Sequence, residues 1–395
     1  MQGAALHIRK IMAPLGIGLG IALCAQGPAQ AQLEPLVLPV GNAELTLNGS
    51  AEGALFAPTQ PGNKANASGI LRVSPSLSRM YDSGFSWSLN ATLAGSDPLS
   101  RGRYDGDVLE KAYAETRLLL IPIKVGMVDG AAANLQVMGP RAGQALDDAQ
   151  TIFFRDPSGR PLTTIFAPRT ALTSSANYAK ILVESPTLFG VTLAFSFTPS
   201  EGKNVLPWLA AGPQANGRQS TIWEGALRYS DDFGPLTMSG YFGGAFGAAE
   251  RKLPGQQGVS EFGLGARSDY HVDEELTLSL GGSWRKSNAH AFDNHRAYTG
   301  SDTRQMDVSA GASYGSWSAA LEYTNGVAET VAGLPRLSFN GTQASLRYAF
   351  DDSLAISTGW QRLGYDRSTG TFFNGARQLE MRAFFVKLHL NTTAP

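Results

Sequence analysis

The sequence is short of charge, of cysteine and of long apolar runs. Only 16% of its 395 residues are charged, and the formal net charge is −1. This near-neutral balance argues against a nucleic-acid partner, which would select for a basic stripe. The single cysteine, Cys24, lies in the N-terminal segment, so the rest of the chain has no disulfide framework. No apolar stretch of membrane-helix length follows residue 31, which excludes a helical membrane protein.

Residues 1–31 are typical of a signal peptide. Arg9 and Lys10 precede an uncharged apolar stretch, and Ala29-Gln30-Ala31 is a small-residue cleavage site. Cleavage after Ala31 would remove two of the 32 basic residues and none of the 33 acidic ones, so the net charge becomes 30 minus 33, or −3. Leu23 precedes Cys24 where a lipidation site needs a small residue, which favours an ordinary cysteine of the apolar stretch. Residues 32–395 are then one exported domain.

Period-two alternation of apolar and polar residues runs through most of this domain and predicts strands. Clear examples are Leu45 to Leu55, Leu71 to Leu77, Phe85 to Leu93, Met306 to Tyr314 and Leu379 to Leu390. Each run has about ten residues, enough for a tilted strand to cross a bilayer. A soluble all-β protein would alternate too, but its polar faces would be rich in Lys and Glu, whereas these are mostly Ser, Thr, Gly and Asn.

Short turns alternate with long polar loops, as in outer-membrane barrels, where the periplasmic turns are short. We therefore predict an all-β fold: a transmembrane antiparallel β-barrel of about 16 strands in the bacterial outer membrane, in contact with its lipid. Aromatic residues beside the short turns should form the periplasmic girdle; they are Phe85, Tyr229, Phe233, Tyr270, Tyr314, Trp317, Tyr348 and Phe350.

Residues 130–171 break the strand pattern. A structureless insert of roughly 40 residues is rare within a compact domain and is usually functional. Its charged residues are Arg141, Asp147, Asp148, Arg155, Asp156, Arg160 and Arg169. We expect this insert to be a loop folded into the lumen.

The chain resembles Gram-negative porins, and is most similar to general porins of the α-proteobacterial type. The resemblance rests on short motifs: Lys111-Ala112-Tyr113, Lys124-Val125-Gly126 and Asp129-Gly130 before the insert, and residues 177–199 after it. It implies a 16-stranded barrel, usually a homotrimer, whose third loop narrows the lumen. The chain departs from the family at its end, because Asn391 to Pro395 follow the last strand where an aromatic residue is usual.

A constriction follows from this resemblance. The acidic residues Asp147, Asp148 and Asp156 would face basic residues of the wall, and opposed fixed charges set selectivity in channels. The wall bases expected to point inward are Arg72, Lys111, Arg117, Arg228, Arg267, Arg347 and Arg382. Alternatively, Arg141, Arg155, Arg160 and Arg169 tie the insert to wall acids such as Glu115 or Glu224.

Two functions fit these features: a porin for passive diffusion of small hydrophilic solutes and ions, or a substrate-specific channel with a weak solute-binding site. Inward aromatics on which solutes could stack are few, Tyr113 and Tyr241, which favours passive diffusion. His290, Asp293 and His295 form only a weak metal motif, and no Ser/His or Asp/His set is evident near a strand end. We therefore expect no metal, no cofactor and no enzymatic activity.

Overall fold

The structure is a computed structural model. It describes residues 34–59, 65–96, 109–118, 120–143, 146, 169–175, 178–201, 219–250, 254–289, 298–330, 335–372 and 374–392. The predicted signal peptide, residues 1–31, lies outside these ranges. No helix among the described residues is long and apolar enough to cross a membrane.

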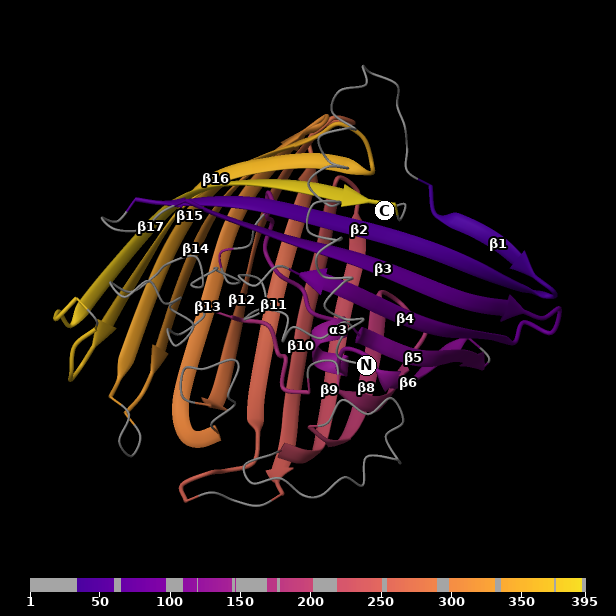
Figure 1. Cartoon of the computed structure of the whole chain (residues 1–395), viewed down its shortest axis with the longest axis horizontal. Coiled ribbons are helices and arrows are strands. Elements are labelled where there is room, and N and C mark those ends of the chain that lie inside the picture. The colour runs from indigo at the N-terminus through magenta and orange to yellow at the C-terminus, as the bar shows by residue number, and fades with distance from the viewer. Residues whose placement is uncertain are drawn as a thin grey trace, which may run out of the picture.

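The chain forms a closed antiparallel barrel (Figure 1). In chain order the strands are β1 (Leu36–Val40), β2 (Ala43–Pro58), β3 (Asn66–Met80), β4 (Ser86–Ser96), β5 (Leu109–Leu118), β6 (Ile121–Met127), β7 (Ala179–Glu184), β8 (Val191–Ser200), β9 (Gln219–Phe233), β10 (Leu236–Ala249), β11 (Ser260–His271), β12 (Leu276–Ala289), β13 (Tyr298–Tyr314), β14 (Trp317–Ala328), β15 (Leu337–Ala349), β16 (Leu354–Arg367) and β17 (Gln378–Asn391). Strands β2 to β17 pair in sequence order, and β17 pairs with β2, so that sixteen strands close the ring. The predicted fold class is confirmed.

Alternation sets the two faces of this wall, because successive side chains of a strand point to opposite sides. On β13, Asp307 and Ser309 are buried on the inner face, whereas Met306 and Val308 are exposed on the outer face. The inner face is polar and the outer face apolar, which is the arrangement of a barrel that faces lipid.

Strand β1 is an addition that the sequence analysis missed. It pairs with β2 from Leu36↔Leu47 to Val40↔Ala43, through a tight turn at Gly41, whose φ is +62°. Strand β17 occupies the same edge of β2 further along and ends at Asn391↔Ser50. β1 therefore continues the line of β17 and projects at the right of Figure 1. A Gly-Asn pair after an apolar run is a hairpin signal that could have revealed it.

The girdle predicted at the short turns is present. Phe85, Tyr314, Trp317 and Phe350 are between 40% and 57% exposed and follow or precede short turns. The Trp317 and Tyr348 rings pack with their centroids 4.7 Å apart. Trp and Tyr favour this position because each has an apolar ring and a polar N–H or O–H group that suits the membrane interface.

Candidate channel lumen and constriction

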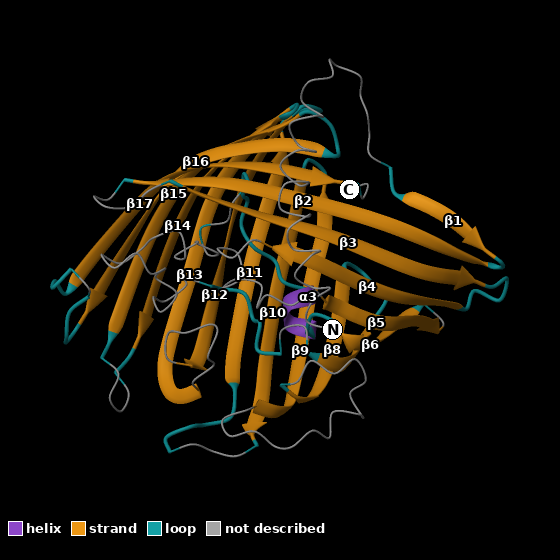
Figure 2. Cartoon of the chain, in the orientation of Figure 1, coloured by secondary structure: helices purple, strands orange, loops and turns teal. Residues whose placement is uncertain are grey.

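The described parts of the insert, residues 130–143, 146 and 169–171, lie inside the barrel, as expected. The insert begins after β6 with the only helix among the described residues, α3 (Ala131–Asn134), which sits within the ring of strands in Figure 2. Its apolar side chains pack on the inner wall: Ala131, Leu135, Val137 and Leu172 form one buried cluster with Leu182, Ala194, Ala226 and Tyr241 of β7 to β10. Burial of this apolar surface is what holds the insert against one side of the lumen.

Inward glycines let the insert lie close to the wall. A Cβ at Gly265 of β11 would collide with the carbonyl oxygen of Val137. A Cβ at Gly281 of β12 would lie 2.8 Å from Gly139 Cα, and one at Gly311 of β13 would lie 2.9 Å from Pro140 Cβ. We call Gly265, Gly281 and Gly311 the glycine row. It marks the path of the insert across three adjacent strands.

Wall acids bind the backbone of the insert. Glu224 of β9 accepts a hydrogen bond from the Ala132 N–H at Oε2 and from the Ser175 N–H at Oε1, each 3.2 Å long. It therefore joins the outgoing arm of the insert, residues 130–143, to its returning arm, which runs from residue 169 to residue 175. On β14, Glu322 Oε2 accepts the N–H of Leu146 at 2.9 Å. Charged acceptors make stronger hydrogen bonds than neutral ones, so these contacts fix the insert firmly.

The returning arm is held by an ion pair of the wall. Arg285 of β12 donates from Nη2 to Glu261 Oε1 at 2.6 Å and from Nη1 to the Arg169 carbonyl at 3.3 Å. Ser174 donates to the other oxygen of Glu261, and Thr170 bonds Ser283 at 2.7 Å. The sequence had suggested that insert arginines reach wall acids. Among the described residues, Glu224 receives backbone N–H groups of the insert, and Arg285 of the wall also reaches the insert. The role of the insert arginines stays a prediction.

Six of the seven wall bases that were predicted to point inward lie on the inner face by strand register; that they line a constriction stays a prediction. Arg72, Lys111, Arg117, Arg228, Arg267 and Arg347 share the inward parity of their strands. Arg382 is a correction: it shares its parity with the exposed Phe384 and Val386 and points outward, while Ala383 and Phe385 are buried inside. The predicted acidic partners, Asp147, Asp148 and Asp156, lie outside the described residues, as do Arg155 and Arg160.

Four of the inward bases have acidic partners. Arg72 pairs with Glu110 at 2.8 Å, Lys111 with Asp129, Arg117 with Glu115 and Arg267 with Asp269. Within the described ranges, Arg228 and Arg347 form no ion pair. Among the six bases, these two are thus the ones whose charge the described part of the wall compensates least.

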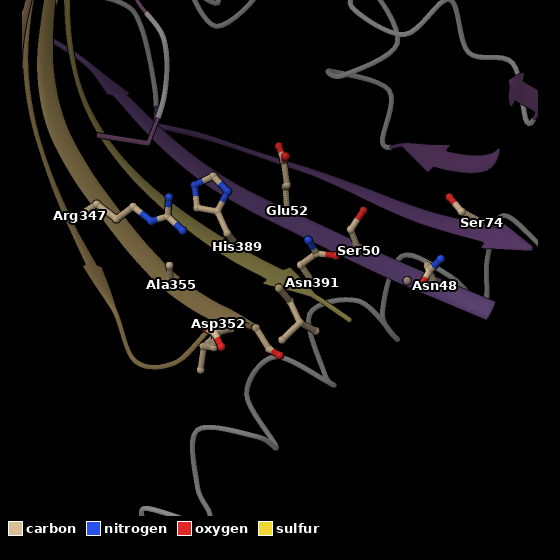
Figure 3. Close-up of a pocket in the computed structure, with 13 residues that line it drawn as sticks. Asn48, Ser50, Glu52, Ser74, Arg347, Asp352, Ala355, His389 and Asn391 are labelled. Atoms are coloured by element: carbon tan, nitrogen blue, oxygen red, sulfur yellow. The ribbon is translucent and has the colours of Figure 1, made fainter. Parts of the chain in front are cut away.

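A cavity of about 490 Å³ opens where β2, β3 and β15 to β17 approach their short-turn ends. Arg347, His389 and Glu52 project toward it from three strands, and Asn391 and Ser50 lie to their right in Figure 3. His389 Nε2 also lies 3.3 Å from Ser357 Oγ. This Ser–His pair could not be seen in the sequence, because the two residues are 32 positions apart. Ser357 is only 1% exposed.

Inward aromatic residues are more numerous than the sequence suggested. Phe56 packs on Phe385, and Phe339 on Tyr365, with ring centroids 5.9 and 5.1 Å apart. All four are at most 3% exposed. They are packing groups under the inner surface and present no open face for a solute.

No metal-ligand cluster of three or more His, Cys, Asp or Glu occurs among the residues that the structure describes. The candidate ligands His290, Asp293 and His295 fall outside them.

Comparisons with known proteins show the fold of this chain but do not assign the chain to a family. No protein-family model and no curated protein matches the sequence. Among solved structures, OmpT of Vibrio cholerae, an outer membrane protein, aligns with a TM-score of 0.54 over 90% of this chain and 99% of its own, at 10% identity. A form of it described as a trimer aligns with a TM-score of 0.54 over 88% and 99%, at 8% identity. A mutant porin of Rh. blastica aligns with a TM-score of 0.49 over 88% and 99%, at 16% identity.

These matches correct one expectation. From the sequence we expected no enzymatic activity, but the likeness to OmpT, at 10% identity, shows the fold alone and leaves the chemistry of the lumen open. Together with the Ser357–His389 contact, it removes the ground for that exclusion. What the comparisons do show is that this chain has the fold of an outer-membrane β-barrel.

Proposed function

We propose that this chain is a porin: a water-filled channel for passive diffusion of small hydrophilic solutes and ions, narrowed by the insert. The observation that carries the proposal is the attachment of the insert to the inner wall at Glu224, Glu261 and Glu322. A 16-stranded barrel without a filling encloses an aqueous lumen. A segment bound along its inner face reduces the open cross-section.

Selectivity in this proposal depends on fixed charges of the lumen. Arg228 and Arg347, which form no ion pair with the described residues, supply inward positive charge, and the insert acids Asp147, Asp148 and Asp156 would oppose it. The likeness to the proteins described above supports an outer-membrane location, and we further propose a homotrimer. Its interface would be the outward face of β2 to β5, where small residues allow close approach; they include Gly49, Ala51, Gly53, Ala67, Gly69, Ala91, Ala112 and Ala114.

A substrate-specific channel is the second candidate. The cavity beside Arg347 and His389 favours it, since a concave site with convergent polar groups is where a solute would dwell.

Deletion of residues 144–168 tests the porin proposal. The barrel should still insert, because its backbone hydrogen bonds lie between strands. Single-channel conductance in a planar bilayer should rise severalfold and ion selectivity should fall. The matched control shortens the loop between β8 and β9, residues 202–218, which should leave both quantities unchanged. Unchanged conductance in the 144–168 deletion would show that the insert does not narrow the path.

A further inference from the structure

Two clusters of charged residues lie on the outward face of the barrel, near the ends of the strands that carry the long loops. The first triad is Lys286 of β12 with Asp302 and Arg304 of β13. The second triad is Arg362 of β16 with Glu380 and Arg382 of β17. Their outward orientation follows from register: Lys286 pairs directly with Arg304, Arg362 pairs directly with Arg382, and each alternates with buried inward residues.

The triads have the same internal geometry. In each, one carboxylate bridges two bases. Asp302 Oδ1 lies 3.1 Å from Arg304 Nε and 3.6 Å from Lys286 Nζ. Glu380 Oε2 lies 2.7 Å from Arg362 Nη2, and its Oε1 lies 2.6 Å from Arg382 Nε. Each triad therefore has a net charge of +1, and its acid orients two cations side by side.

The bases are exposed. The side chains of Lys286, Arg304, Arg362 and Arg382 are 47%, 57%, 36% and 54% accessible. Each guanidinium has five N–H donors, of which a carboxylate uses one or two, so donors remain for a further anion.

The two triads lie on one side of the barrel, on β12, β13, β16 and β17. On β8 to β11 the outward positions toward the long loops carry Phe197, Trp223, Phe246 and Phe262 instead. An outward charge is tolerated near the membrane interface, where long side chains extend their charged ends toward the headgroups. The anions available there are lipid phosphates, and the guanidinium fork matches phosphate oxygens.

We propose that the two triads bind the phosphate groups of lipid headgroups in the leaflet on the long-loop side of the membrane. Two oriented cations complement a phosphate group, which carries between one and two negative charges. The acid keeps the bases apart and in place when no lipid is bound.

The test measures binding of diphosphoryl lipid A to the full chain in detergent micelles by native mass spectrometry. In one variant Lys286, Arg304, Arg362 and Arg382 are all changed to Gln, and its affinity should fall about tenfold or more, because charge-assisted hydrogen bonds are lost. The matched control is Arg79→Gln, since Arg79 is an outward base at the short-turn end, where it stacks on Tyr81. This control should bind as the unchanged protein does.

Further variants of the triads and further ligands distinguish the possible outcomes of this test. Arg362→Lys with Arg382→Lys keeps the charge and loses the fork, and should weaken binding less than Gln at both positions. Variants of one triad alone provide the test if the fourfold variant does not fold.

Equal binding of dephosphorylated lipid A, or no loss in the Gln variants, would overturn the proposal. Inorganic phosphate that binds as tightly as the lipid would indicate a free-anion site and would overturn the lipid assignment. Conductance should be the same in all these variants, so the result is independent of the proposed channel.

Discussion

Single residues show how far alternation determines this wall. Leu278, Val308 and Leu346 are 46%, 47% and 40% exposed on the outer face, and Ser279 and Ser345 are buried on the inner one, as the pattern predicts. Arg382 was predicted from alternation to point inward, but in its strand it alternates with the buried Met381 and Ala383 and points outward. The alternation along the strand determines on which face Arg382 lies, because successive side chains of a strand must point to opposite faces of the sheet. The charge is accommodated by Glu380.

Val308→Arg tests the outer face. Val308 lies midway along β13, and Arg at the bilayer midplane should lower the free energy of unfolding by about 2–4 kcal/mol. The control is Ser313→Arg, which is inward and only half-buried in the same strand. Urea unfolding from lipid vesicles measures both variants. Equal losses would mean that the two faces are assigned wrongly.

At the scale of elements, the insert and its wall fit each other. The lack of apolar–polar alternation in the insert indicated that the insert is not a strand, but could not show where the insert attaches to the wall. Attachment depends on glycines, Glu224 and Arg285, which lie on strands far from the insert in sequence. A glycine within a strand is a weak signal from sequence alone, since it fits a bulge or a close approach equally well.

Gly265→Val tests this fit. The new side chain would meet the Val137 carbonyl, so the insert must move from the wall or the barrel must strain, at a cost of about 1–3 kcal/mol. We expect higher conductance and faster proteolysis of the insert. Gly240→Val is the control, since an added Cβ there meets no atom closer than 4.0 Å. If Gly265→Val and Gly240→Val behave alike, the glycine row has no role in seating the insert.

At the scale of the whole molecule, the outer face is uneven. Strands β2 to β5 carry a group of small outward residues, among them Gly49, Ala51, Gly53 and Gly69, beside exposed leucines such as Leu55 and Leu89. Small side chains permit the close approach that a subunit interface of protein-like packing density needs.

Gly53→Trp tests the proposed trimer. A Cβ at Gly53 meets nothing within 4 Å in the single chain, so the barrel itself should fold unchanged. The indole would separate neighbouring subunits and weaken each contact by about 1–3 kcal/mol. Light scattering in detergent should report monomers. Leu321→Trp, at a position already 66% exposed on β14, is the control and should leave the trimer intact. A trimer that survives Gly53→Trp would place the interface elsewhere.

The sequence by itself determined the barrel, its inward and outward residues and the existence of an insert, because these depend on local alternation and on loop length. Only the tertiary structure decided how the parts meet: the addition of β1 to the edge of β2, the binding of both insert arms by Glu224, the contact of Ser357 with His389, and the two outward triads. Each of these joins residues whose contacts are set by strand register and barrel closure. No pattern within a single strand encodes register around a closed ring.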